Sequence, residues 1–279
     1  MELLVRAYND FKYDALNVGI NDLALGVTFL QQFEKEATFP FLSANVSTNT
    51  GKLIFQPYTI VKKDGLRIGI VGVTNGNNNL PEIQYKDVVE TARQMQSRLA
   101  EKTDFLVLLA SVYNPDADRL KQSNLAYDLI IRSHTSRFSR YPRTVGDKQS
   151  ADGFFIETGK EGKSLHFVNF HRENPNATVV DISRKKQRLS FIQQRLNQLK
   201  EKAKGESLQE AYAGSQATLD FIKDLQDQSN GLKSEIENAQ NYIALDIQSL
   251  GAQVADNEKW LKAVNRYMAY EDSVKNSLR

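Results

Sequence analysis

The spacing of apolar residues changes once along the chain, near Pro175, and this change restricts the fold more than any other feature. Before Pro175, short apolar runs alternate with amphipathic stretches, a pattern that predicts strands and helices in alternation. The expected strands cover residues 15–18, 58–61, 67–73, 105–109, 128–131, 154–157 and 165–170. We therefore expect residues 1–175 to form an α/β domain with a largely buried sheet.

The sequence after Pro175 contains no proline and is rich in Gln, Glu, Lys and Leu, which favour helix. Apolar residues recur at heptad-like spacing in two stretches, from Ile182 to Ala203 and from Leu232 to Met268. Because an amphipathic helix needs another surface to cover its apolar face, the two stretches should pack together. We expect residues 176–279 to form a long antiparallel helical hairpin that resembles a coiled coil.

Three places in this helical part have the glycine and turn chemistry that can end a helix. They are Gly205, Gly214 and residues 229–231. A turn at residues 229–231 leaves two arms of about 70 Å, which can cover one another along most of their length. We therefore place the turn of the hairpin near residues 229–231. A three-helix arrangement with an earlier break stays open.

Composition argues against several classes of function. Lys and Arg number 36 against 34 Asp and Glu, so no broad basic surface favours nucleic acid. No apolar run is long enough to span a bilayer. Cysteine is absent, which removes disulfides and thiolate metal ligands, and histidine is limited to His134, His166 and His171. A histidine-rich metal site therefore has few residues to draw on.

Five segments before Pro175 carry strand and loop motifs in a definite order. They read YDALNVGINDLALG at 13–26, FPFLSANV at 39–46, PYTIVKKDGLRIGIVGVTNG at 57–76, YDLIIRSHTS at 127–136 and GFFIETGKEGKSLHFVNF at 153–170. Together they resemble the calcineurin-like metallophosphoesterases, most closely the branch of 5'-nucleotidases and 2',3'-cyclic phosphodiesterases. The resemblance implies an incomplete metallophosphoesterase-type α/β sandwich, followed here by the helical hairpin.

The resemblance also implies a site for two divalent metal ions, held by aspartate, asparagine and several histidine ligands. The matching positions in this chain are Ile20, Asn21, Asp22, Ser111, His134 and Ser136. Ile20 stands in place of the asparagine, and Asp22 keeps the acidic position. Asn21, Ser111 and Ser136 stand where the family has histidines. Because at most one imidazole remains, we expect no catalytic residue, no metal site and no other cofactor.

The retained residues also have simple structural interpretations. Asp22 fits a turn or a helix cap, and His134 fits a hydrogen-bonded loop residue at the end of a strand. The basic stretch at residues 132–143 fits a solvated surface loop, although it could also contact an anion. None of these interpretations requires catalysis.

The first strand of the family, which carries an Asp-x-His motif, has no counterpart here, because residues 2–11 resemble the helix before the Gly-Asn-His loop. The resemblance thus describes a degenerate and N-terminally truncated member. We expect a protein that is not an enzyme but a catalytically inactive structural or interaction module, whose hairpin binds a protein partner or a second copy. The alternative is a divergent metal-dependent phosphoesterase or 5'-nucleotidase whose first metal-binding strand lies upstream of Met1.

A third interpretation is a module that binds a ligand in the former active-site cleft. The family resemblance favours a location outside the cytoplasm, in the periplasm or at the cell surface, although residues 1–11 lack the apolar run of a signal peptide. We expect neither a nucleic-acid partner nor a membrane span.

Overall fold

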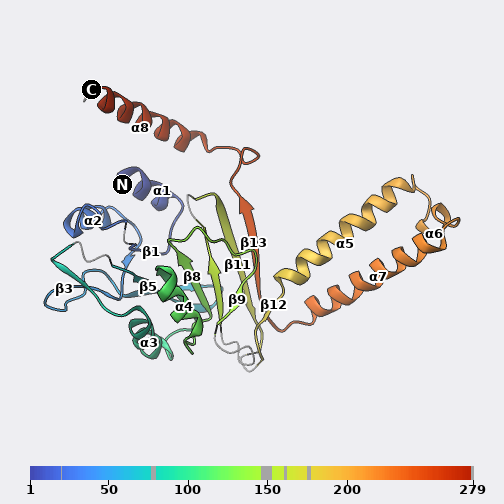
Figure 1. Cartoon of the computed structure of the whole chain (residues 1–279), viewed down its shortest axis with the longest axis horizontal. Coiled ribbons are helices and arrows are strands. Elements are labelled where there is room, and N and C mark those ends of the chain that lie inside the picture. Colours follow the sequence, from blue (N-terminus) through green and yellow to red (C-terminus); the bar gives the residue numbers. More distant parts are fainter. Residues whose placement is uncertain (20, 77–79, 146–152, 160–161, 175–176, 278–279) are drawn as a thin grey trace. The chain divides into compact units, whose positions relative to one another are not determined.

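A six-stranded sheet forms the centre of the α/β part of the chain (Figure 1). In a computed structural model, its strands follow the order β4 (Tyr58–Lys63), β5 (Leu66–Thr74), β7 (Phe105–Ser111), β8 (Leu129–Ser133), β10 (Phe154–Glu157) and β9 (Arg143–Thr144). The four inner strands run parallel, whereas the edge strands β4 and β9 pair antiparallel with β5 and β10. The carboxyl ends of the parallel strands therefore meet at one edge of the sheet.

The structure describes residues 1–19, 21–76, 80–145, 153–159, 162–174 and 177–277. The chain divides into two units, each with apolar clusters of its own. The first unit contains residues 1–139, 143–165 and 249–279, and the second contains residues 140–142 and 166–248. The expected boundary at residues 175 and 176 lies outside the described residues.

The inner strands of the sheet are apolar, and the structure buries them. β7, with the sequence FLVLLAS, is buried over almost its whole length. The helices α3 (Val88–Leu99) and α4 (Asn114–Gln122) pack apolar residues into the same core, where Leu108 and Phe155 are fully buried. The α/β class and the strands expected from the apolar runs are therefore confirmed.

A second apolar core lies among short strands and the first two helices. These elements are α1 (Glu2–Asp10), β1 (Leu16–Asn17), α2 (Val27–Glu34), β2 (Phe41–Leu42), β3 (Val46–Thr48) and β6 (Ile83–Tyr85). β1 pairs with β2, and β3 pairs with β6. An added Cβ at Gly72 of β5 would lie 2.8 Å from the carbonyl oxygen of Leu42. Glycine at this position therefore lets β2 approach the main sheet.

The second unit combines a helical hairpin with most of a small sheet (Figure 1). The sheet contains β11 (Ser164–Arg172), β13 (Asn241–Ser249) and β12 (Val180–Asp181) in that order. The helices α5 (Ser183–Lys202) and α7 (Gln216–Glu237) lie side by side, and the short α6 (Leu208–Ala211) lies in the connection between them. Ile192, Ile222 and Leu225 are buried in this hairpin. A helical hairpin is thus present, but it is shorter than the sequence pattern indicates.

The expected turn at residues 229–231 is wrong, because α7 continues through these residues. The chain reverses between α5 and α7 instead, where Lys204 and Gly205 have positive φ angles of 51° and 98°. The reversal is stabilised by a capping box between Ser207 and Glu210. Gly231 costs a helix interior only about 1 kcal/mol, which the packing of α7 on α5 offsets.

The expected second arm of the hairpin is also wrong. Residues 241–249 form β13, whose sequence NYIALDIQS carries the β-branched and aromatic residues that favour a strand. The remaining helix, α8 (Glu258–Ser277), lies in the first unit, where it contacts α1. Trp260 of α8 packs against Phe11, with 6.3 Å between the ring centroids. Among the described helices, none has the length and apolar character needed to cross a membrane.

Candidate functional site

Polar side chains gather where the parallel strands end. Thr74, Ser111 and Ser133 are register partners on β5, β7 and β8, so they form one row along the carboxyl edge of the sheet. Arg132 of β8 is likewise the register partner of Glu157 on β10. In sheets of this kind the carboxyl edge is the usual position of a ligand site. This edge is therefore the candidate functional site.

The structure brings together two residues that the sequence singles out, Asp22 and Ser111, on either side of Gly19. The Gly19 N–H donates to the Asp22 carboxylate at 2.8 Å. A Cβ added at Gly19 would lie 2.9 Å from Ser111 Oγ and 3.4 Å from Asp22 Oδ2. Asp22 closes a turn here and does not cap α2, whose N-cap is Gly26. Ile20 lies outside the described residues.

The pKa of the Asp22 carboxyl is raised by burial, although the Gly19 N–H acts in the opposite direction. A raised pKa favours the protonated form of the folded protein, so the charged carboxylate costs stability at neutral pH. The Asp22→Asn variant should therefore gain stability relative to the natural chain as pH rises above the ordinary value of 3.8. Urea unfolding of both chains across this pH range measures the difference, and a constant difference would contradict the assignment.

A cavity of about 230 Å³ lies beside this row, at the ends of β7 and β8. Its lining consists of polar and aromatic residues, namely Tyr113, Asn114, Arg132, His134, Thr135, Ser136 and Arg137. We call it the 113–137 pocket. It brings together His134 and Ser136, two of the residues that the sequence singles out. Asn21, by contrast, is an exposed turn residue that does not line the pocket.

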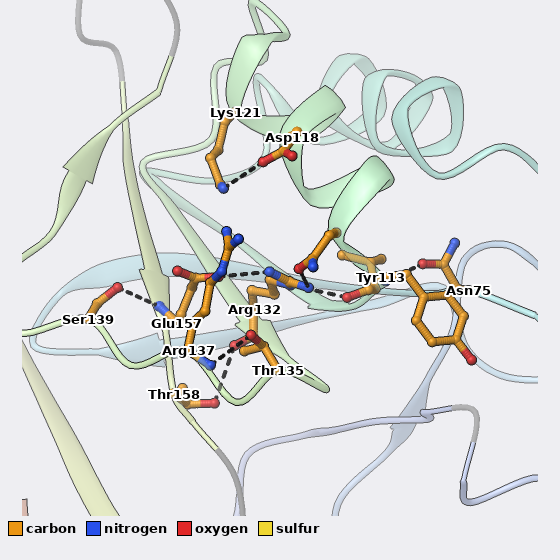
Figure 2. A network of polar contacts seen from close by, with 12 residues as sticks. Asn75, Tyr113, Asp118, Lys121, Arg132, Thr135, Arg137, Ser139, Glu157 and Thr158 are labelled. Carbon is orange, nitrogen blue, oxygen red and sulfur yellow. Dashed lines mark hydrogen bonds and ion pairs between the residues drawn. The ribbon is translucent and has the colours of Figure 1, made fainter.

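Arg132 is the buried centre of the 113–137 pocket (Figure 2). Its side chain is 2% exposed and pairs with the fully buried Glu157 at 2.7 Å. Its other nitrogens donate to the Val112 carbonyl at 3.1 Å and to Asn114 Oδ1 at 2.8 Å. Ser139 Oγ accepts the Glu157 backbone N–H at 2.9 Å. Three of the five guanidinium N–H groups have these partners, and the other two have none among the described residues.

His134 has a backbone conformation that only a few non-glycine residues adopt. Its φ is +57°, in the left-handed region. The imidazole stands edge-on to Tyr113, with 5.0 Å between the ring centroids and an interplanar angle of 83°. Strained conformations of this kind cluster at functional sites. The turn directs the chain into the lining residues Thr135 and Ser136 instead of continuing β8.

The start of α4 is fixed against the pocket by Asn75, which follows β5. The Asn75 amide accepts the Tyr113 N–H at 2.6 Å and donates to the Asp116 carboxylate at 2.6 Å. Because the N-terminus of a helix carries partial positive charge, α4 adds to the attraction for an anion at Tyr113 and Asn114.

Three cationic side chains, Lys121, Arg137 and Arg132, act on the carboxylate of Asp118 on α4. The pKa of Asp118 is lowered first by its hydrogen bond from Lys121 and further by the charges of Arg137 and Arg132. Figure 2 shows Lys121 beside Asp118, with Arg132 and Arg137 near Glu157. The arrangement is chemically suited to hold an anion with several oxygen atoms.

Several known proteins match part of this chain in sequence or in fold. No protein-family model matches the chain. Protein UshA of Yersinia enterocolitica is 33% identical over 112 residues, which cover 37% of this chain and 20% of UshA. The trifunctional nucleotide phosphoesterase YfkN of Bacillus subtilis is 28% identical over 148 residues, covering 47% of this chain and 10% of YfkN. The crystal structure of a 5'-nucleotidase precursor from Thermus thermophilus has the same fold, with a TM-score of 0.55 at 22% identity over 61% of this chain and 38% of that one.

Over part of its length, the α/β part is similar in sequence to 5'-nucleotidases and nucleotide phosphoesterases, and it shares the fold of calcineurin-like phosphoesterases. The chain spans 20% or less of the two curated relatives named above. The expectation that the protein is not an enzyme is contradicted, because YfkN is named as a nucleotide phosphoesterase and the Thermus protein as a 5'-nucleotidase.

The described residues do not fit the pair of metal ions that this phosphoesterase family implies. Within the described ranges, no group of three or more His, Cys, Asp and Glu side chains is placed to hold a metal ion. At the sheet edge, Asp22 and His134 are ionisable, whereas Ser111 and Ser136 offer neutral hydroxyls. The absence of a metal site stays a prediction, since other residues with oxygen ligands, among them Asn77, Asn78, Asn79 and Asp147, are not described. What the described residues supply is a set of hydrogen-bond donors for an anion.

The sequence alone does not predict the central pair of this candidate site, Arg132 and Glu157. Arg132 falls within the basic stretch at residues 132–143, which suggested an anion contact as the less favoured interpretation. Glu157 ends an apolar strand and carries no motif of its own. One sequence signal was available for the pair: two apolar strands each carry a charged residue near the end. Because a buried charge needs a partner, the two residues could be expected to pair.

Proposed function

We propose that this chain acts on a phosphate ester of the nucleotide type and holds its phosphate group in the 113–137 pocket. The observation that carries the proposal is Arg132, a guanidinium held rigidly by buried Glu157 that lines a cavity at the carboxyl edge of a phosphoesterase-type sheet. The nucleotide phosphoesterase name of YfkN supports the class of ligand.

The lining groups match a phosphate in both charge and hydrogen bonding. A phosphate presents acceptor oxygens, which bind guanidinium groups in bidentate fashion. Arg132 has two N–H groups left, and exposed Arg137 adds a second guanidinium. Thr135 Oγ1 accepts a hydrogen bond from the backbone N–H of Arg137 at 3.0 Å. The hydroxyl hydrogen of Thr135 is therefore left to donate to the ligand. His134 supplies an imidazole to the lining, a group of the kind that can exchange a proton with an ester oxygen.

Calorimetric titration of the full chain with AMP, inorganic phosphate and adenosine tests the binding. We expect AMP and phosphate to bind and adenosine to bind far more weakly, because the pocket recognises the anion. Release of phosphate from AMP, measured with no added metal and with Mn²⁺, Co²⁺ or Zn²⁺, then tests turnover. A chain that binds neither AMP nor phosphate contradicts the proposal.

The Arg137→Ala variant should bind phosphate at least about tenfold more weakly, because a charge-assisted hydrogen bond contributes roughly 1.5–3 kcal/mol. Arg140→Ala is a matched control, since Arg140 is an exposed arginine in the same stretch that does not line the pocket. The same titration measures both variants. If both variants lost the same affinity for phosphate, binding would depend only on the general charge of the surface and not on the pocket.

A location outside the cytoplasm is also part of the proposed function. Its support is that the Thermus thermophilus relative is described as a precursor. Fractionation of cells that express the natural gene, followed by immunodetection, tests the location. Recovery of the protein with the cytoplasmic fraction would contradict it.

A further inference from the structure

Two phenylalanines of the hairpin are exposed, although each lies beside a buried isoleucine. Phe191 of α5 is 67% exposed and Phe221 of α7 is 43% exposed, whereas Ile192 and Ile222 are buried between the helices. Aromatic side chains gain much free energy from burial, and they are enriched at protein interfaces. Their exposure on a helix pair therefore needs an explanation.

Both phenylalanines face the same side of the hairpin. The Arg188 guanidinium of α5 donates to Gln228 Oε1 of α7 at 2.8 Å, which defines one side of the pair. Phe191 follows Arg188 by three residues, and Phe221 precedes Gln228 by seven, so each lies on the same helix face as its reference residue. We call this side the Phe191/Phe221 face.

The two helices carry opposite charge. α5 contains seven basic residues and one acidic residue, whereas α7 contains five acidic residues and two basic ones. On the Phe191/Phe221 face, helical spacing places basic residues along the α5 side and acidic residues along the α7 side. They are Arg184, Arg188 and Arg195 on α5, and Asp224 and Glu235 on α7, where Glu235 is already paired with Lys185 of α5 at 2.8 Å. The face therefore has an apolar centre with a basic border and an acidic border.

We propose that a second copy of this chain covers the Phe191/Phe221 face, so that two hairpins form a four-helix bundle. A two-fold axis parallel to the hairpin sets α5 of one copy against α7 of the other, which brings each basic border onto an acidic one. In this arrangement Arg195 lies opposite the partner's Asp224. An axis perpendicular to the hairpin would set α5 against α5, where like charges repel. Charge complementarity thus selects both the partner and the arrangement.

Light scattering of the full chain after size-exclusion chromatography tests the dimer. We expect a mass twice the 31.6 kDa of one chain, and a weaker dimer at high salt, which screens the border charges. The double variant Phe191→Gln, Phe221→Gln should be monomeric. Leu25→Gln is the matched control, because Leu25 is 70% exposed on the first unit, and it should remain dimeric. Circular dichroism checks that each variant keeps its helix content.

A charge exchange tests the arrangement independently of folding. Arg195→Asp and Asp224→Arg should each give a monomer, because each sets like charges across the interface. An equimolar mixture of the two variants should form a dimer, since every border pair between different chains is then of opposite charge. Effects within one hairpin cannot be restored by mixing. A monomeric natural chain, a dimer in the phenylalanine variant, or a mixture that stays monomeric overturns the proposal.

Discussion

The Arg132→Ala variant should lower the free energy of unfolding of the first unit by about 3–5 kcal/mol, the usual cost of removing one partner from a buried ion pair. The reason is that the fully buried Glu157 would lose the guanidinium 2.7 Å away and leave a buried carboxyl group without its partner. Among the described residues, Glu157 Oε2 already has no hydrogen-bond partner, so the carboxylate depends strongly on Arg132. Urea unfolding followed by circular dichroism measures the loss.

Two further variants separate the burial of the charge from the loss of an arginine. Arg6→Ala is the matched control, because Arg6 is 64% exposed and lies 3.8 Å from an exposed glutamate, Glu2. It should change stability by less than about 1 kcal/mol. The double variant Arg132→Met, Glu157→Gln should recover much of the loss, since it leaves no buried charge. Equal effects of Arg132→Ala and Arg6→Ala would contradict the role of Arg132.

The sheet of this phosphoesterase-type domain is predictable from sequence because its strands are buried. A parallel strand covered on both sides needs an apolar run, and β5, β7 and β10 each have one. The helices α3 and α4 follow β5 and β7, as the alternation of strand and helix patterns indicates. The α/β class therefore follows from local patterns alone.

The helical part shows where local patterns fail. The apolar residues Ile243 and Ile247 fit a heptad, but Ile243 and Leu245 also fit the alternation of a strand. Pairing of β13 with β11 and β12 decides between them, and that pairing joins segments far apart in sequence. A helix through the glycine at 231 is similarly decided by its packing on α5, which no turn propensity reports.

The candidate site could be predicted only where a motif existed. Asp22 and Ser111 occupy positions of two different family segments, and both lie near Gly19. The pairing of Arg132 with Glu157 depends instead on the register of β8 and β10, which a single sequence does not reveal. The register of β8 and β10, more than the residue types, thus decides which side chains meet at this edge of the sheet.

The Gly153→Ala variant should be the most destabilising glycine substitution, by about 3 kcal/mol or more. A Cβ at Gly153 would lie 1.8 Å from the carbonyl oxygen of Tyr127, which belongs to the backbone and cannot rotate away. The chain must therefore shift at the start of β10, where Phe154 donates its N–H to the Asp128 carbonyl at 3.0 Å. Thermal unfolding monitored by circular dichroism measures the effect, which should appear as a lower melting temperature.

The Gly231→Ala variant should have a higher melting temperature, the opposite of the effect at Gly153, and therefore serves as a control. Gly231 lies inside α7, and an added Cβ there meets no heavy atom within 4 Å. Alanine in a helix interior is more favourable than glycine by about 1 kcal/mol, because glycine loses more backbone entropy on folding. Gly231→Ala should therefore stabilise the hairpin while Gly153→Ala destabilises the sheet. If Gly153→Ala left the melting temperature unchanged, the close approach of β10 to Tyr127 would be wrong, and with it the register that pairs Arg132 with Glu157.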